Sequence, residues 1–342
     1  MKGFPVEYPV IQAPMLGITS PEMVAAVSCS GCLGSLPLGG LSPEKTAELI
    51  RKTKELTDKP FAVNLFAHSI PAVDKEVAES MQGYLYQLGM KYQIPFKQQP
   101  VESIQFHSYR EQIDILLSEG IKVVSFTFGI LDNITIHRLK QNHVILMGTA
   151  TCLEEALLLD KKDVDIIVAQ GIEAGGHRGT FVGSSLPQIG LMSLLPEIIE
   201  NTSRPVIAAG GIADAKAIHA AFMLGAQGVQ AGSVFIASNE SLAVPSYKAV
   251  IQQATQTDTV LTRCFSGRWA RSIRNCFIDE MEQSGLTLPD YPIQNSLTTP
   301  LRTTAQQADN KDFISLYAGE SANKAQSKPV SDIISQLIKE MR

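Results

Sequence analysis

Residues 164–181, VDIIVAQGIEAGGHRGTF, join an apolar segment to a polar, glycine-rich loop. The apolar run at 166–169 is typical of a strand that is covered on both faces, as in a parallel sheet. The loop after it carries one imidazole, that of His177. Because α/β proteins place their chemistry in the loops that follow parallel strands, we expect the functional site here.

The same strand–loop–helix unit recurs along the chain at a spacing of roughly 25 residues, the size of a βα unit. Eight such units predict an α/β fold of the (β/α)8 TIM-barrel type. The rival is an open doubly wound sheet, which favours G-x-G-x-x-G after its first strand, and that motif is absent there. The predicted strands lie at 10–11, 32–38, 61–66, 123–128, 144–147, 165–169, 205–209 and 228–231.

Helix starts carry their usual signals. Ser20-Pro21 and Ser42-Pro43 each predict an N-cap followed by proline at the first helical position. Thr151 and Glu154 have the spacing of a capping box for a later helix. The chain ends in an amphipathic segment that we expect to pack back on the barrel.

Two segments depart from the barrel pattern. Residues 67–106 are rich in Pro, Gln and Tyr and predict an excursion over the third strand, either a lid or substrate wall or a structural flap. Residues 239–311 contain helical stretches and no clear strand. We therefore predict a barrel at 1–238 and 312–342, with a second, smaller, mainly helical domain at 239–311 that caps the substrate.

Three arginines in this second segment, Arg268, Arg271 and Arg274, are three residues apart, which places them on one face of a predicted helix. They form either a solvated face, an interdomain contact or a contact to an acidic ligand.

Composition limits the possible partners. The chain has 342 residues, 44% hydrophobic and 18% charged, with a net charge of -5. We see no basic tract for nucleic acid, no membrane span of about 20 apolar residues and no signal-peptide core, so we expect a cytoplasmic protein. The five cysteines predict no disulfide framework. Cys29-Ser-Gly-Cys32 is either a redox or metal pair, or two small residues at a helix–strand junction.

Glycines end the seventh and eighth predicted strands, at Gly210-Gly211 and at Gly232-Ser233. Glycine lets the backbone approach a ligand, and in barrels these two loops commonly bind phosphate through N–H groups. Tight turns without a ligand are the alternative. Because both glycine sites fall at expected strand ends, the sequence favours a phosphate site.

Other strand ends suit a flat heterocycle. The side chains of Asn64, Gln170 and Gln230 can donate and accept hydrogen bonds in one plane, and Met15 can lie against a ring face. His177, with an ordinary pKa of about 6.5, can take a proton at neutral pH, unless it only hydrogen-bonds the loop. We find neither a metal-ligand spacing nor a Ser-His-Asp grouping.

Several segments, taken together, resemble the class I nitronate monooxygenases, formerly called 2-nitropropane dioxygenases. They are VIQAPM, FAVNLF, VSFTFG, DIIVAQGIEAGGHRGTF, PVIAAGGIADAKAI and GVQAGSVFIAS, and later FSGRWAR and FISLYAGE. The resemblance covers nearly the whole chain. It implies an FMN-binding barrel with a helical second domain, which oxidises alkyl nitronates, of the propionate 3-nitronate type, with O2 to a carbonyl compound and nitrite.

The resemblance also implies a role for each matching residue. His177 matches the family's catalytic base for neutral nitroalkanes. Tyr317 and Glu320 depart from the pattern, since the family tends to have Trp and Gln there. The implied cofactor contacts are Ala13, Pro14, Met15, Asn64, Gln170, Gly171, Gly175 and Gly176 at the flavin ring, and Gly210, Gly211, Gly232 and Ser233 at the phosphate.

Two other functions fit these residues. Flavin-dependent enoyl-acyl-carrier-protein reductases share the barrel and a similar E-A-G-G-H loop, but they have paired glycines in place of Ala13-Pro14 and use NAD(P)H; NADH:quinone reductases are a related alternative. The other is a flavin-binding protein without turnover, in which His177 is structural. The expected partners are a small nitronate or nitroalkane and O2, with a homodimer as one possible assembly.

Overall fold

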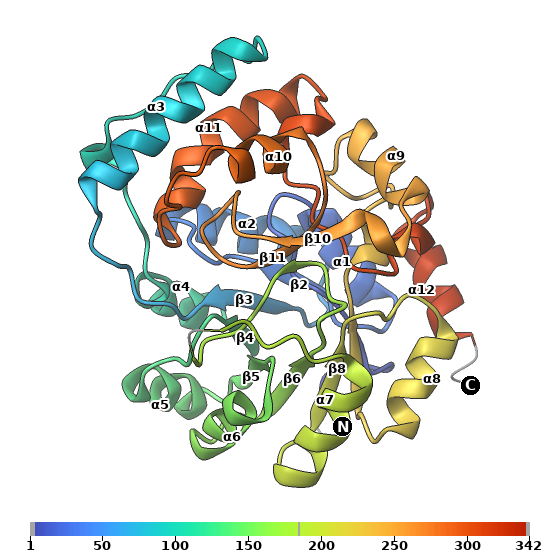
Figure 1. Cartoon of the computed structure of the whole chain (residues 1–342). Helices are drawn as coiled ribbons and strands as arrows, with labels where there is room; N and C mark the ends of the chain where they lie inside the picture. The colour runs from blue at the N-terminus through green and yellow to red at the C-terminus, as the bar shows by residue number, and fades with distance from the viewer. Residues whose placement is uncertain (1–3, 184, 340–342) are drawn as a thin grey trace.

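Eight parallel strands form the centre of the molecule (Figure 1). The computed structural model describes residues 4–183 and 185–339. The strand order is β1-β9-β8-β6-β5-β4-β3-β2, and a parallel bridge between Ile11 and Leu33 brings β1 beside the segment that leads into β2. The ring is therefore nearly closed, which confirms the barrel and excludes the open sheet. The strands are β1 (Val10–Gln12), β2 (Ser35–Pro37), β3 (Ala62–Phe66), β4 (Val123–Thr127), β5 (Ile145–Ala150), β6 (Ile166–Gln170), β8 (Val206–Ala209) and β9 (Gly228–Ala231).

Strand β6 shows why the apolar runs predict buried parallel strands. Ile166 and Val168 point into the barrel and belong to its inner cluster. Ile167 and Ala169 point outward and belong to the larger cluster between strands and helices. Since successive strand side chains face opposite sides, a strand buried on both sides must be apolar throughout. Gln170 then ends the run at the barrel rim.

The surrounding helices begin largely where the sequence predicts. Ser20 and Ser42 cap their helices through their hydroxyl oxygens, which accept from backbone N–H groups. The Thr151–Glu154 capping box is wrong: the N-cap residue is Cys152, and Glu155 instead binds Thr151. The barrel helices are α1 (Pro21–Cys29), α2 (Pro43–Leu56), α4 (Ile113–Ser118), α5 (Asn133–Gln141), α6 (Leu153–Lys161), α7 (Leu191–Asn201) and α8 (Ala215–Met223). The terminal helix α12 (Val330–Ile338) packs on α1 and α8, as expected.

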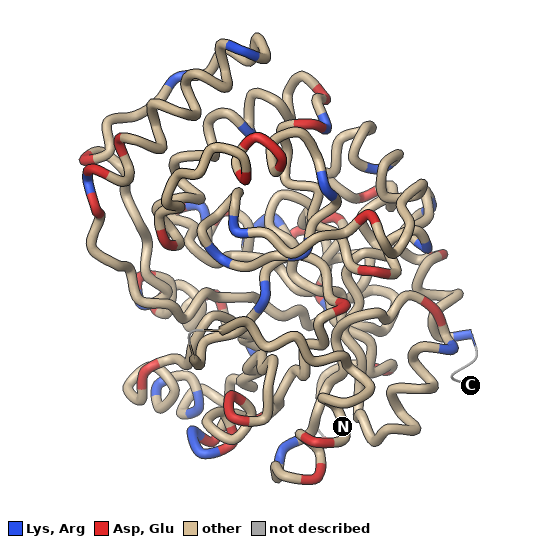
Figure 2. Tube along the Cα trace, in the orientation of Figure 1, with Lys and Arg blue, Asp and Glu red and all other residues tan. Residues whose placement is uncertain are grey.

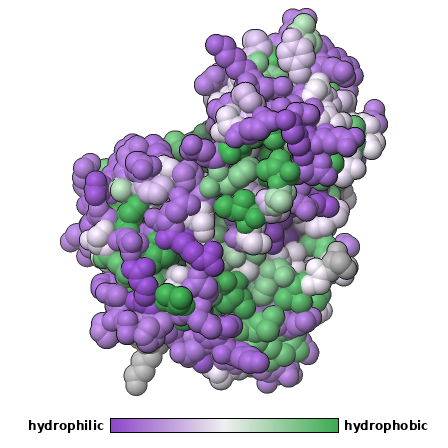
Figure 3. Space-filling view, turned by 90° about the vertical axis from the view of Figure 1, so that its left-hand side faces the viewer, coloured by the Kyte–Doolittle hydropathy of each residue, from purple (hydrophilic) through white to green (hydrophobic). Residues whose placement is uncertain are grey.

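A second hydrophobic cluster joins the excursion at 67–106 to the later part of the chain. The excursion forms α3 (Lys75–Lys91), which packs against α11 (Ile293–Gln307). The helices α10 (Cys276–Gln283) and α9 (Pro245–Gln253) contribute to the same cluster and lie on the same side of the barrel, with α9 farthest from α3 (Figure 1). Apolar side chains gather in a recess where the part that carries α3 meets the barrel (Figure 3). The domain boundaries themselves stay a prediction.

The expectation of no clear strand at 239–311 is wrong. Strands β10 (Thr259–Thr262) and β11 (Ala270–Ile273) pair antiparallel, and β11 also pairs with β7 (Gly176–His177). Strands of four residues that mix polar and apolar side chains show too little periodicity to be recognised in a sequence. In addition, β11 pairs with β7, which lies in a loop almost 100 residues earlier in the chain. The helix expected to carry the three arginines is therefore also wrong, since the middle one lies in β11.

Charged residues of both signs are scattered along the described parts of the chain (Figure 2). No described helix is long and apolar enough to cross a membrane. Cys29 ends α1 and is exposed, whereas Cys32 is buried. Burial, and next the Glu7 carboxylate, raises the pKa of the Cys32 thiol to about 12. Since a redox pair needs an accessible thiolate, this favours the structural interpretation of the two cysteines.

Candidate active site

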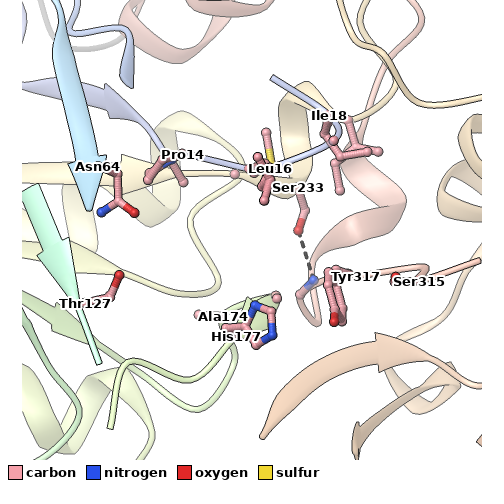
Figure 4. A pocket seen from close by; sticks show the side chains of 18 of the residues that line it. Pro14, Leu16, Ile18, Asn64, Thr127, Ala174, His177, Ser233, Ser315 and Tyr317 are labelled. Atoms are coloured by element: carbon pink, nitrogen blue, oxygen red, sulfur yellow. Dashed lines mark hydrogen bonds between the residues drawn. The ribbon is translucent and has the colours of Figure 1, made fainter. Parts of the chain in front are cut away.

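A cavity of about 380 Å³ lies at the carboxyl ends of the barrel strands (Figure 4). This volume falls in the range of roughly 300–1,000 Å³ that is usual for small-molecule sites. Its wall comes from the loops after β1, β3, β4, β6, β8 and β9, together with α11 and the segment at 314–321. The residues predicted from the sequence that line it are Ala13, Pro14, Met15, Asn64, Gln170, Gly175, Gly176, His177, Gly210, Gly211, Gln230, Gly232 and Ser233.

Gly171 is the one predicted residue that lies behind the wall. Its N–H donates to the Ala209 carbonyl at 2.8 Å, and a Cβ there would stand 2.2 Å from a Glu173 carboxylate oxygen. The absence of a side chain at Gly171 therefore lets the loop pack closely against Glu173 and Leu191. Gly171 itself does not line the cavity.

Glycines make a backbone cradle on the cavity wall. Gly210 and Gly211 have φ values of 115° and 69°, which favour glycine. A Cβ on Gly175 would lie 2.4 Å from the backbone nitrogen of Gly319, so that these two segments touch only because the residue is glycine. The Gly319 N–H in turn donates to the Ser233 hydroxyl at 2.9 Å (Figure 4). Glycines thus bring the backbone of several loops close together on the cavity wall, an arrangement that fits a phosphate.

Gly176 fits a flat ligand for a different reason. Its φ is 70°, and a Cβ built on it would meet nothing within 4 Å. It lines the cavity, so the open space in front of it is the cavity itself. The residues present thus fit a cofactor with a phosphate at one end and a planar ring at the other.

The acidic residues near this cradle are held by partners. The Glu320 carboxylate pairs with the buried Arg271 at 3.0 Å, and it does not line the cavity. Glu173 does line it, but its oxygens accept from the Leu191 N–H at 2.8 and 3.1 Å, at the first turn of α7, where a carboxylate is stabilised by the helix dipole. Glu320 in place of glutamine therefore sets no free negative charge against a phosphate.

Arg271 and Arg274 serve internal contacts. Arg271 also donates to the Ile172 carbonyl at 3.0 Å, which ties β11 to the loop after β6. Arg274 is exposed and pairs with Asp279 at 2.7 Å and with Glu282 at 2.6 Å. Arg271 thus joins β11 to the loop after β6, whereas Arg274 lies on a solvated face.

His177 stands on the cavity wall among aromatic rings (Figure 4). Its ring centroid lies 5.5 Å from that of Phe128 and 5.1 Å from that of Tyr317. Its Nε2 is 2.8 Å from the Ser266 hydroxyl oxygen. Burial, followed by the nearby Arg268 and Arg302 guanidinium groups, lowers the pKa of His177 to about 3. The imidazole is therefore neutral throughout the physiological pH range.

The amide side chains predicted to face the ring differ in how many hydrogen bonds they make within the protein. Gln170 is engaged by its own loop: it donates to the His177 carbonyl at 3.1 Å and accepts from the Gly179 N–H at 2.8 Å. Asn64 donates to the Ser125 hydroxyl at 2.9 Å. Gln230 makes no side-chain hydrogen bond to any residue within 4–183 and 185–339, so both ends of its amide are available to a ligand.

Sequence reasoning missed the charged groups that hold the His177 loop. Arg178 is fully buried and donates to the carbonyl oxygens of Gly171 at 2.6 Å and Gln170 at 2.8 Å. Glu155, also fully buried, accepts from the backbone N–H groups of residues 181 and 182. The signal for Arg178 was available, because a lone arginine next to His177, in a loop expected to line a buried site, needs buried partners. Glu155 gave no signal, since its partners in the His177 loop lie 25 residues and more away along the chain.

No metal site accompanies these groups: residues 4–183 and 185–339 contain no cluster of three or more His, Cys, Asp or Glu side chains that could hold an ion. The fold and the cavity together define a barrel enzyme whose site lies at the carboxyl ends of the strands.

Comparison with known proteins assigns the family. A sequence model of the nitronate monooxygenase family matches residues 1–340. Proteins named probable nitronate monooxygenase from Staphylococcus saprophyticus and Staphylococcus aureus are 41% identical over 339 residues and 39% identical over 340 residues, each covering 98% of this chain and 95% of the relative. The chain belongs to the nitronate monooxygenase family and is an oxidoreductase. Flavin is the cofactor expected for this family.

Solved structures agree with this assignment. A nitroalkane oxidase from Streptomyces ansochromogenes is similar with a TM-score of 0.90 and 34% identity, covering 98% of this chain and 96% of that one. FabK from Thermotoga maritima is similar with a TM-score of 0.76 and 28% identity, covering 98% and 93% of the two chains.

Proposed function

We propose that this chain is an FMN-dependent enzyme that oxidises alkyl nitronates, of the propionate 3-nitronate type, with O2 to a carbonyl compound and nitrite. The observation that carries the proposal is the His177 imidazole, which is kept neutral on the wall of a cavity that also holds a glycine cradle. Membership of the nitronate monooxygenase family supports the reaction class.

The cradle residues would hold the cofactor. Gly210, Gly211, Gly232 and Ser233 would bind the phosphate through backbone N–H groups, and the open face of Gly176 would lie against the ring. The other expected ring contacts, all on the cavity wall, are Ala13, Pro14, Met15, Asn64, Gln170, Gly175 and Gln230, and Gly171 would support them from behind the wall. FMN, when bound, supplies the redox chemistry that the oxidation of a nitronate by O2 needs.

His177 would act as the base when the substrate arrives as a neutral nitroalkane. Removing a carbon-bound proton leaves a nitronate anion beside a protonated imidazole. Burial, and next the guanidinium groups of Arg268 and Arg302, keep the imidazole neutral in the ligand-free site. Arg302, which lines the cavity, would also stabilise that anion. Ser266 would hold the ring in place through Nε2. A preformed nitronate has already lost this proton, so its oxidation would not need His177 as a base.

A reductase is the second candidate, because of the structural likeness to FabK from Thermotoga maritima. Ala13-Pro14, where such reductases have paired glycines, argues for the oxidase. The two functions differ in their reductant: an NAD(P)H reductase reduces its flavin with NADH, whereas the proposed enzyme takes electrons from the nitronate.

Two measurements test the proposal. The purified protein should be yellow and release FMN on denaturation. A well-folded, colourless preparation would contradict the assignment of FMN as the cofactor. His177→Asn should lose turnover of neutral nitroalkanes by about 10²–10⁴-fold, the usual contribution of a general base, and lose far less on preformed nitronates. Equal loss on both substrates would show that His177 is structural.

A further inference from the structure

Arg302 is a cation on the cavity wall without a counter-charge. It extends from α11, and no carboxylate in the described part of the chain pairs with it. Its contacts are neutral oxygens: the hydroxyls of Thr298 at 3.0 Å, Ser315 at 2.8 Å and Thr299 at 3.0 Å, and Asn295 through its carbonyl at 3.1 Å and its Oδ1 at 2.9 Å. A charge in such a site normally has a counter-charge, and the described part of the chain supplies none for this guanidinium. An anionic ligand could supply it.

The guanidinium also has a donor to spare. Arginine carries five N–H groups. Nε donates to Thr298, Nη1 makes one bond to Ser315, and the three acceptors at Nη2 share its two hydrogens. One Nη1 hydrogen is therefore left for a ligand. The neighbouring wall is neutral, because Asn295, Thr299 and Ser315 all line the same cavity.

Tyr317 supplies a second free donor beside it. Its side chain lines the cavity close to His177 (Figure 4), and its buried hydroxyl makes no hydrogen bond of normal geometry in residues 4–183 and 185–339, although the Ser266 and Ser315 hydroxyls and the Arg302 guanidinium lie near it. Ser315, the hydroxyl partner of Arg302, lies two residues before it. A buried hydroxyl left unpaired costs about 1–3 kcal/mol, which a ligand oxygen would remove.

We propose that Arg302 and Tyr317 form a subsite for a planar oxyanion, and that this subsite holds an oxygen pair of the anionic substrate. The inference rests on the proposed function and adds to it the residues that select the anion. The phosphate cradle is made of glycine backbone and Ser233, whereas this subsite is made of the Arg302 and Tyr317 side chains. Two sources of the oxyanion fit: the nitronate group itself, or the carboxylate of a nitronate that carries one.

Nitrate, a planar monoanion with the O–N–O geometry of a nitronate, is the probe. It is titrated by calorimetry into the flavin-loaded protein and into Arg302→Gln and Tyr317→Phe. We expect nitrate to bind about tenfold more weakly to Arg302→Gln, a loss of about 1.4 kcal/mol, and about fivefold more weakly to Tyr317→Phe. Arg138→Gln on α5, whose exposed side chain pairs with Asp114, is the matched control and should bind like the wild type.

The KM values for two nitronates then identify the oxyanion. If the subsite takes the nitronate group, Arg302→Gln raises KM for ethyl nitronate and propionate 3-nitronate alike; if it takes the carboxylate, only the second KM rises. Unchanged nitrate affinity and unchanged KM values in Tyr317→Phe and in a folded, flavin-loaded Arg302 variant would overturn the inference. Arg302→Lys, which keeps the charge, replaces Arg302→Gln if the glutamine variant does not fold. If the wild type oxidises no nitronate while nitrate still loses affinity in these variants, the proposed reaction fails and the subsite stands.

Discussion

Glu155→Gln tests the buried contacts that hold the His177 loop. Glu155 Oε2 accepts from the Thr151 N–H at 2.6 Å and from its hydroxyl at 2.8 Å. Oε1 accepts from the Thr180 hydroxyl at 2.8 Å and from the N–H groups of Phe181 at 2.5 Å and Val182 at 3.1 Å. All five partners donate, which is the pattern of an ionised carboxylate.

A glutamine has one acceptor oxygen, so its NH2 group must face one of these two sets of donors. With the amide oxygen toward residues 180–182, the Thr151 N–H loses its acceptor, which costs about 1–3 kcal/mol for a buried donor. The remaining bonds lose their charge assistance, at about 1 kcal/mol each. Three bonds remain at residues 180–182, so we expect Glu155→Gln to lower the free energy of unfolding by about 4–6 kcal/mol, a large part of the roughly 5–15 kcal/mol usual for a domain.

Urea unfolding of the purified protein measures this loss. Glu154→Gln, at the exposed neighbouring position, is the control and should stay within about 0.5 kcal/mol of the wild type. Since the same donors belong to the loop of His177, turnover of neutral nitroalkanes should fall in Glu155→Gln as well. If Glu155→Gln is as stable as Glu154→Gln, the loop is held by other contacts and the reasoning is refuted.

Three further predictions concern the cavity. Gly176→Ala should reduce the amount of flavin bound per chain, measured by absorbance, because the added Cβ would enter the cavity. The control is Gly120→Ala, which has a similar φ of 68° and open space around it and should keep its flavin. Equal flavin contents in the two variants would contradict the glycine cradle. Ser266→Ala should lower kcat for neutral nitroalkanes and shift its pH profile while leaving KM for preformed nitronates in place; a uniform loss would contradict a role in holding the imidazole. Burial, followed by Arg268, lowers the pKa of His68 to about 4, and that of His177 is also lowered, to about 3, so the unfolded chain takes up protons first. The free energy of unfolding, measured in urea, should be at its maximum well above pH 6.5 and fall by about 4 kcal/mol by pH 5, about 2 kcal/mol for each imidazole; His68→Phe should show about half of this fall, and a flat profile would contradict this.

The barrel could be predicted because its information is local. Each apolar run, such as 166–169, encodes a strand covered on both faces, and each following glycine or amide marks where that strand ends. In a closed parallel barrel all strand ends meet at one rim, so residues as distant as Asn64 and Gly232 fall on one cavity wall. The candidate site therefore followed from the fold.

The rest depended on contacts between distant segments. Strands β10 and β11 are short, and β11 owes part of its pairing to the loop of His177. Glu155 looks like any helix residue until residues 180–182 fold over it. Arg302 lies on a helix with an ordinary polar face, and only the cavity in front of it shows that its charge has no partner. Sequence periodicity carries none of these relations.

The excursion at 67–106 illustrates the same limit. Its composition predicted either a lid or a flap over the third strand. Its helix α3 packs against α11 through the second hydrophobic cluster, and none of its described residues lines the cavity. The place of α3 depends on packing against a helix more than 200 residues later in the chain, so it cannot be deduced from local composition.

Oxygen consumption by the purified, flavin-loaded protein tests the central claim most directly. With an alkyl nitronate and no NADH, we expect rapid uptake of O2 and the appearance of nitrite. With NADH and no nitronate, we expect neither. Bleaching of the flavin by NADH together with no oxygen uptake on any nitronate would contradict the proposed reaction and favour the reductase.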